Sequence, residues 1–249
     1  AVFAFERQLT RHVLVHVLCT HRAPEGYDQL VIIGSQAIPT TDPYLIDRIA
    51  SIAVLKGCRV LLCLNKCDLD PAQELYDSYA ASTIPVLRVS AATGEGLPEL
   101  RRAMKGKLNA LTGNSGVGKS SLMNSLFPQL GLETGIISKK LGRGKHTTRQ
   151  AQLYRLSELD PAMTGYAADT PGFSTVDTER YCRIPAGELD NSFREFAKFA
   201  EKCRFADCAH IKEKDCAVRA AAESGEIAKS RYESYLRMHE EASKINDWE

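Results

Sequence analysis

Short apolar runs alternate with amphipathic stretches along most of the chain. Runs such as residues 29–34 and 59–64 are compact and end at glycine or at polar residues, which is typical of buried strands. The stretches between the runs repeat their apolar residues at helical spacing. Strands are predicted at 29–34, 59–64, 85–89, 107–112 and 166–168, and helices at 43–53, 71–81, 97–104 and from 121 to 127. This alternation predicts an α/β fold with a mostly parallel sheet and helices on both faces.

Residues 113–120, GNSGVGKS, match the phosphate-loop pattern G-x-x-x-x-G-K-[ST] at every fixed position. Such a loop turns backbone N–H groups toward a polyphosphate, while its lysine reaches the outer phosphates and its serine contacts Mg²⁺. An accidental glycine turn is the alternative, but a predicted strand before it and a predicted helix after it favour phosphate binding. The candidate residues are Gly113, Asn114, Ser115, Gly116, Val117, Gly118, Lys119, Ser120 and Ser121.

A second motif, Asn65-Lys66-Cys67-Asp68, follows the run 59–64 and precedes the phosphate loop, which reverses the order of ordinary GTPases. The Asp68 carboxylate can accept hydrogen bonds from N1–H and N2–H₂ of guanine, whereas adenine would present a lone pair to it. The amide of Asn65 can bridge neighbouring loops, and the stem of Lys66 can cover the purine ring. The small residues Ser90 and Ala91 follow the next predicted strand, where backbone N–H groups can approach the guanine oxygen.

The tetrapeptide at 169–172, DTPG, lies beyond the phosphate loop and completes a nucleotide site. Asp169 can hold Mg²⁺ through water, and the N–H of Gly172 can contact a γ-phosphate. An ordinary turn is the alternative for an isolated D-x-P-G. Residues 142–149 form a glycine-rich basic loop in which Thr147 or Thr148 is placed to bind Mg²⁺. The candidate magnesium ligands are Ser120, Thr148 and Asp169.

Three cysteines and a histidine cluster near the C-terminus as Cys203-x4-Cys208-x-His210-x5-Cys216. These side chains supply the four ligands of a closed, structural zinc site. A disulfide and an accidental cluster are the alternatives, and a reducing cytosol disfavours the first. The remaining cysteines are expected in the core as small hydrophobic residues: Cys19, Cys58, Cys63, Cys67 and Cys182.

Composition narrows the class of protein only a little. The chain has 249 residues, 44% of them hydrophobic and 25% charged, with a net charge of +1, which is ordinary for a soluble globular protein. No run approaches the length of a membrane span, and no secretory leader is evident, so we expect a cytoplasmic protein with no membrane partner. We also expect a monomer. The basic segment 139–145 is a candidate contact for nucleic acid.

The motif order resembles that of the circularly permuted GTPases of the RsgA (YjeQ/YloQ) family, from Asn-Lys-x-Asp through the phosphate loop and Asp-Thr-Pro-Gly to the zinc spacing. The resemblance implies a GTPase that binds GTP and GDP with Mg²⁺, carries one zinc ion and acts with the small ribosomal subunit and its rRNA. Phe173 occupies the position where many GTPases place a water-orienting glutamine. The resemblance implies that His146 serves as the catalytic residue instead; a solvent-exposed or RNA-contacting histidine is the alternative.

Three segments follow from this interpretation: residues 1–27, which we interpret as the remnant of an oligonucleotide-binding barrel; a permuted GTPase domain at 28–182; and a helical zinc-binding domain at 183–249. The first segment is too short for a five-stranded barrel, so RNA binding through such a barrel is not claimed. A nucleotide-gated RNA- or protein-binding module with negligible hydrolysis stays open as a second function, because of Phe173. An ATPase ranks third, because of Asp68.

Overall fold

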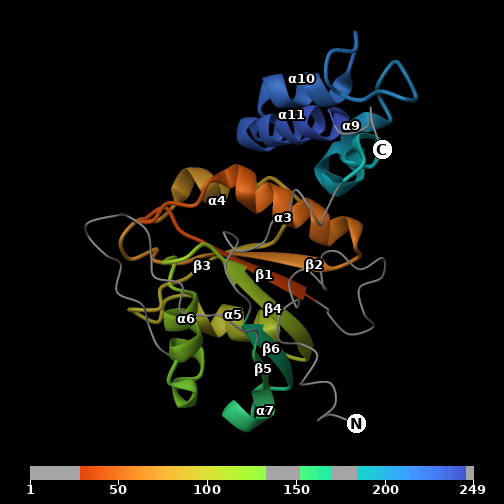
Figure 1. Cartoon of the computed structure of the whole chain (residues 1–249). Helices are drawn as coiled ribbons and strands as arrows, with labels where there is room; N and C mark the ends of the chain where they lie inside the picture. The colour runs from red at the N-terminus through yellow and green to blue at the C-terminus, as the bar shows by residue number, and fades with distance from the viewer. Residues whose placement is uncertain (1–28, 133–151, 170–183, 245–249) are drawn as a thin grey trace, which may run out of the picture.

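The computed structural model describes residues 29–132, 152–169 and 184–244. Its centre is a six-stranded sheet in the order β3-β2-β1-β4-β6-β5, in which only β5 is antiparallel to its neighbour. This confirms the predicted α/β fold with a mostly parallel sheet (Figure 1). The strands are β1 (Gln29–Gly34), β2 (Arg59–Leu64), β3 (Val86–Arg88), β4 (Lys107–Gly113), β5 (Gln152–Arg155) and β6 (Gly165–Asp169).

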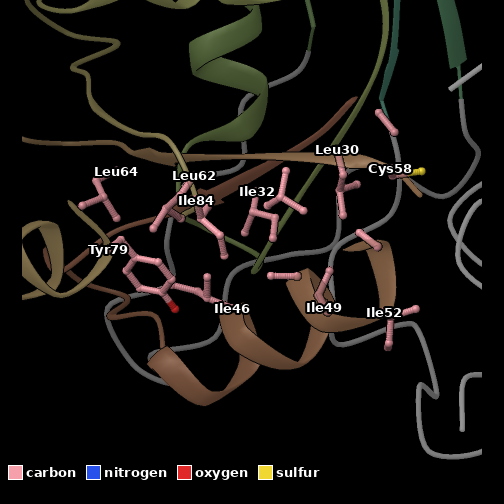
Figure 2. Close-up of a cluster of buried hydrophobic side chains, with 14 of the residues drawn as sticks. Leu30, Ile32, Ile46, Ile49, Ile52, Cys58, Leu62, Leu64, Tyr79 and Ile84 are labelled. Carbon is pink, nitrogen blue, oxygen red and sulfur yellow. The ribbon is translucent and has the colours of Figure 1, made fainter. Parts of the chain in front are cut away.

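Helices cover both faces of the sheet because β1 and β2 direct alternate apolar side chains to opposite sides. One face packs against α3 (Pro43–Leu55) and α4 (Gln73–Ala80), with Ile32 and Leu62 opposite Ile46 and Ile49 (Figure 2). The other face packs against α5 (Leu97–Met104), α6 (Lys119–Leu126) and α7 (Leu156–Leu159). A 3-10 turn, η1 (Pro128–Leu130), follows α6.

The sequence at the start of α3 explains why the helix begins there. The Asp42 side chain accepts a hydrogen bond from the Tyr44 N–H over 2.9 Å, and proline occupies the first helical position. A side-chain cap and a proline at this position both favour initiation, since neither disturbs a bond inside the helix. No helix among the described residues is long and apolar enough to cross a membrane.

The C-terminal module lies against the α3 and α4 side of the sheet (Figure 1). It contains the 3-10 turns η3 (Ala186–Glu188), η4 (Asp190–Ser192) and η5 (Arg194–Phe196), followed by α9 (Ala197–Ala200), α10 (Ala217–Ser224) and α11 (Lys229–Ser243). Its aromatic core includes Phe193, Phe196 and Tyr235, and Tyr44 of α3 joins the same cluster. The module therefore shares its core with the sheet domain.

The structure departs from the sequence analysis at three points. The strand β5 was not predicted, and the region at 183–249, predicted to be helical, begins with 3-10 turns around Phe193 and Phe196 that end in the one-turn helix α9. Cys67 is half-buried rather than part of the core, because the residues after β2 turn outward into a loop. Cys58 and Cys63 are buried as predicted, and Cys19 and Cys182 lie outside the described residues.

Candidate nucleotide and metal sites

The phosphate loop connects β4 to α6, as the motif predicts. Gly116 and Gly118 have φ angles of 85° and 91°, which favour glycine. The space around Gly118 also requires a glycine, because a Cβ atom at this position would lie 2.5 Å from Asn65 Nδ2. Asn114 and Ser115 are half-buried in the loop, and the first turn of α6 holds Ser120 and Ser121, where the helix dipole favours an anion.

The base-reading motif meets the phosphate loop although the two are far apart in the chain. The Asn65 amide donates to the Val117 carbonyl over 2.8 Å, and its oxygen accepts from the Ala91 N–H over 3.1 Å. Asn65 is 3% exposed, so both hydrogen bonds are shielded from water. Lys66 Nζ donates to the Gly116 carbonyl over 2.9 Å. One asparagine and one lysine thus join three loops at the carboxyl edge of the sheet.

The aspartate of this motif is held by the second candidate base-reading loop. Ser90 Oγ donates to Asp68 Oδ1 over 2.5 Å and accepts from the N–H groups of Ala92 and Thr93. Ser90 is fully buried, whereas Asp68 is exposed. The hydrogen bond orients one carboxylate oxygen and leaves the other available to a ligand at the loop surface. This arrangement fits recognition of a group with two adjacent N–H donors.

Lys119 and Asp169 form a buried ion pair at the centre of the edge. Lys119 begins α6 and Asp169 ends β6, so the strand order β4-β6 brings them together. Burial lowers the pKa of Lys119 to about 8. These are the two groups that the sequence assigns to the outer phosphates and to Mg²⁺. When a phosphate binds, the Lys119 ammonium would pair with a phosphate oxygen in place of the Asp169 carboxylate. Ser120, the next residue in the chain, is the other magnesium candidate among the described residues.

His146, Thr147, Thr148 and Gly172 lie outside the described residues. Their predicted roles as catalytic residue, magnesium ligands and γ-phosphate contact therefore stay predictions. The same holds for the N-terminal segment 1–27 and for the domain boundary near residue 183.

The four candidate zinc ligands form one cluster, with all ligand atoms within 4.8 Å of one another. The Sγ atoms of Cys203 and Cys216 are 3.9 Å apart, and His210 Nδ1 lies 3.6 and 3.5 Å from them. Tetrahedral zinc requires sulfur–sulfur edges of about 3.8 Å and sulfur–nitrogen edges of about 3.6 Å, given its usual bond lengths. Cys208 supplies the fourth ligand atom. The separations fit a closed tetrahedral metal site.

A carboxylate inside the metal motif braces the loop that carries the histidine. Glu213 accepts hydrogen bonds from the backbone N–H groups of Ala209, Ile211 and Lys212, over 3.1, 2.8 and 3.0 Å. Burial alone would raise the pKa of Glu213, but these backbone hydrogen bonds hold it below its usual value. Burial also lowers the pKa of His210, which favours the neutral imidazole that a metal requires.

Helices α10 and α11 support the same cluster. The Tyr232 hydroxyl donates to the His210 carbonyl over 2.7 Å, and the Tyr235 hydroxyl donates to the Ala209 carbonyl over 2.6 Å. Cys216 caps α10, where its Sγ accepts from the Arg219 N–H over 3.4 Å. The N-terminus of α10 thus lies directly beside one candidate ligand of the cluster.

A buried ion network joins the C-terminal module to the sheet domain. Arg231 of α11 is 2% exposed and pairs with Asp47 of α3 and with Glu195 of η5. The Tyr79 hydroxyl of α4 also donates to Asp47, over 2.5 Å. The guanidinium lies 4.5 Å from the Phe193 ring centre. One arginine therefore connects four elements that the chain presents far apart.

Polar contacts at the rim extend this junction. The Tyr44 hydroxyl donates to Glu241 over 2.5 Å, and Arg48 Nη1 lies 3.5 Å from the same carboxylate. The Arg237 guanidinium lies 3.7 Å from the centre of the Tyr44 ring. The Glu241 side chain is 40% exposed, so solvent weakens these contacts, whereas the pairs of Arg231 are fully buried.

The interpretation of the sequence missed this network and Glu213. The available signal was Asp47, a charge within the otherwise apolar face that holds Ile46 and Ile49. Arg231, one helical turn before Tyr235, was a second signal. Charges at core positions of amphipathic helices require a buried partner. The motifs, by contrast, are contiguous, and the structure brings Asn65, Val117 and Ala91 together as expected.

A base-reading loop, a phosphate loop and a magnesium-type aspartate on one parallel sheet define a P-loop GTPase, and their order along the chain makes it a circularly permuted one. A family model described as RsgA GTPase matches residues 7–179. The chain belongs to the RsgA GTPase family.

Relatives and solved structures agree with this assignment. Proteins named small ribosomal subunit biogenesis GTPase RsgA include one from Thermotoga petrophila, which is 39% identical over 85% of this chain and 70% of its own length. Another, from Gemmatimonas aurantiaca, is 40% identical over 86% of this chain and 68% of its own length. The crystal structure of YjeQ from Thermotoga maritima has a TM-score of 0.69 and 35% identity, covering 88% of this chain and 72% of that one.

The crystal structure of YloQ is titled a circularly permuted GTPase and has a TM-score of 0.69, covering 90% of this chain and 71% of that one. Its identity is 24%, so the likeness concerns the fold alone.

Proposed function

We propose that this chain hydrolyses GTP as a step in the maturation of the small ribosomal subunit. The bridge made by Asn65 carries the proposal, because it joins the base-reading, phosphate and Ser90–Ala91 loops into one site. The names of the curated relatives support the ribosomal part. GTP or GDP would bind with Mg²⁺, which Ser120, Asp169 and a threonine of the 142–149 loop would hold. The bound magnesium would neutralise charge on the transferring phosphoryl group.

Turnover measurements test this function directly. Phosphate release from GTP should accelerate when small ribosomal subunits are added. ATP should give no such release, because adenine would present a lone pair to Asp68 where guanine presents N–H donors. Guanine-nucleotide binding without turnover, with or without subunits, would favour the second function, a nucleotide-gated RNA- or protein-binding module. The specific observation behind that alternative is Phe173 in the place of a water-orienting glutamine.

We expect His146→Ala to lower subunit-stimulated kcat by about 100-fold or more, while the Kd for GTP stays within a factor of about two. A residue that positions the attacking water acts in the transition state, so its loss reduces kcat and spares ground-state binding. Stopped-flow binding and multiple-turnover phosphate release separate the two quantities. His239→Ala on α11 is the matched control, and an unchanged kcat in His146→Ala would remove the histidine from the mechanism.

We infer that Cys203, Cys208, His210 and Cys216 hold one structural zinc ion, supported by the tetrahedral separations and by the four-ligand set. Metal analysis should find one zinc per chain, and a strong chelator should raise hydrogen exchange in α10 and α11 while β1 keeps its protection. Cys208→Ser should lose the metal, and Cys67→Ser, outside the cluster, should keep it. Full zinc content in Cys208→Ser would contradict this ligand set.

We infer also that the zinc loops face rRNA. Exposed Lys202, Arg204, Lys212 and Lys214 lie in two loops that the Arg204–Asp215 ion pair, at 3.0 Å, holds side by side. Phe205 is 44% exposed next to Arg204, as an aromatic ring available for stacking on an unpaired base. Basic residues next to an exposed ring are the combination that single-stranded RNA selects.

Replacing Lys202, Lys212 and Lys214 with alanine should weaken binding to the small subunit and flatten its salt dependence, by about one unit of slope for each lost phosphate contact. Sedimentation with subunits at several salt concentrations measures both quantities. Lys105→Ala, an exposed lysine after α5, should change neither. An unaltered salt slope in the triple variant would place the RNA contact elsewhere.

A further inference from the structure

Residues 35–41 connect β1 to α3 and form a compact loop beside the base-reading lysine. Two hydrogen bonds close the base of the loop: the Thr41 N–H donates to the Ser35 carbonyl over 2.8 Å, and the Ser35 N–H donates to Thr41 Oγ1 over 3.0 Å. Ser35 and Thr41 are 0% and 2% exposed. The ends of the loop are therefore joined by buried bonds, one of which depends on a side chain.

Further hydrogen bonds organise the inside of the loop. Ser35 Oγ donates to the Ala37 carbonyl over 2.9 Å, and Gln36 Nε2 donates to the Thr41 carbonyl over 3.3 Å. At the tip, the Ile38 carbonyl accepts from Lys66 Nζ over 2.7 Å. The Ile38 side chain is 74% exposed, so the loop presents main chain rather than a side chain to the lysine.

Lys66 has a second fixed acceptor on its other side, the Gly116 carbonyl of the phosphate loop at 2.9 Å. Its backbone has a φ of 65°, which directs the side chain back across the loop ends. Two carbonyls from separate loops thus hold one ammonium group, and they define the course of the lysine stem. A long side chain with two anchors loses less freedom when a ring packs against it.

We propose that Thr41 is a positioning residue for the guanine nucleotide: it closes loop 35–41 and thereby keeps the Ile38 carbonyl against Lys66, whose stem covers the purine. The inference rests on the proposed function, because it requires a base at this edge. Contacts to the base are the same in the ground state and the transition state, so Thr41 acts on binding and not on the chemical step.

Thr41→Val tests the proposal, because valine keeps the shape of threonine and removes the acceptor for the Ser35 N–H. We expect the Kd of fluorescent GDP and of a GTP analogue to rise about ten-fold each, with kcat unchanged. Thr41→Ser keeps the hydroxyl and should restore binding to near the wild-type value. Thr40→Val, at the exposed neighbouring threonine, is the matched control and should leave both constants unchanged.

A coupling measurement separates positioning from general support. In a Lys66→Met background, Thr41→Val should cost no further affinity, since the anchored group is already gone. An equal loss in both backgrounds would overturn the proposal. If Thr41→Val fails to fold, Ser35→Ala removes only the Ser35 Oγ bond and should give a loss of about two- to three-fold that is likewise absent with Lys66→Met.

The outcomes distinguish this inference from the function on which it rests. Wild-type protein that binds no guanine nucleotide would overturn the proposed function together with the role of Thr41. Wild-type binding with an unchanged Kd in folded Thr41→Val would overturn the role of Thr41 alone.

Discussion

Replacing Arg231 with methionine should lower the free energy of unfolding by about 3–5 kcal/mol, because it leaves two buried carboxylates without a cationic partner. Asp47 and Glu195 both face this guanidinium and are 0% and 4% exposed. Methionine fills most of the arginine volume, so the expected loss of stability comes from unpaired charge and not from a cavity. Urea unfolding, followed by circular dichroism at fixed zinc concentration, measures the change.

The pH dependence of this loss of stability shows whether unpaired charge causes it. Burial raises the pKa of Asp47 even beside Arg231, and without the arginine the carboxyl would take up a proton more readily still. A group whose pKa is raised on folding stabilises below its unfolded pKa and loses that contribution as pH rises. The deficit of Arg231→Met should therefore shrink as pH falls from 7.5 toward 5.

Lys229→Ala, two residues before Arg231 but 84% exposed in its side chain, is the control and should change stability by less than about 0.5 kcal/mol. A triple variant that also replaces both carboxylates with leucine should recover most of the loss. An Arg231→Met deficit that does not vary with pH would show that lost packing, and not unpaired charge, causes the effect.

Asp68→Asn should weaken GTP binding by about 100-fold or more and improve binding of xanthosine triphosphate. The carboxylate is expected to accept two N–H donors of guanine, and each hydrogen bond to a charged group contributes about 1.5–3 kcal/mol. Xanthine carries a second carbonyl where guanine carries its amino group. This carbonyl repels the carboxylate of aspartate but accepts a hydrogen bond from the amide of asparagine. Competition between the two triphosphates for a fluorescent nucleotide gives both constants.

Ser90→Ala provides a graded comparison, because it removes the hydroxyl that orients Asp68 while leaving the carboxylate in place. We expect a loss of about ten-fold in GTP affinity with guanine still preferred. Equal affinities for GTP and xanthosine triphosphate in the wild-type chain would exclude Asp68 as the residue that selects the base.

The sheet and its covering helices could be predicted from the sequence because their patterns are local. Buried parallel strands such as β1 and β2 are continuous apolar runs, and a single motif identifies the loop after β4. Strand β5 has only four residues at an antiparallel edge, too few for a period to be recognised. The turns around Phe193 and Phe196 follow from packing on Tyr235, which no local pattern reveals.

The candidate site likewise has residues that a local pattern predicts and residues that only the fold brings together. Contiguous motifs pointed to Asn65, to Lys119 and to the three cysteines and histidine that cluster in the structure. The loop closed by Thr41 could not be found. Asp47 and Arg231 each stand out as charges among apolar positions, but their pairing could not be assigned because it depends on the fold. Thr41 also lacks any signature, since one threonine before a helix is ordinary.

The junction between α3 and α11 also imposes an order on synthesis. Asp47 and Arg231 are 184 positions apart, so Asp47 leaves the ribosome long before its partner exists. At about 5–20 residues per second, the delay is roughly 10–40 s. During that interval the face of α3 that holds Tyr44 and Asp47 is uncovered, and the nascent chain must keep it from other apolar surfaces. Helix α11 therefore completes the packing of α3, a helix made long before it.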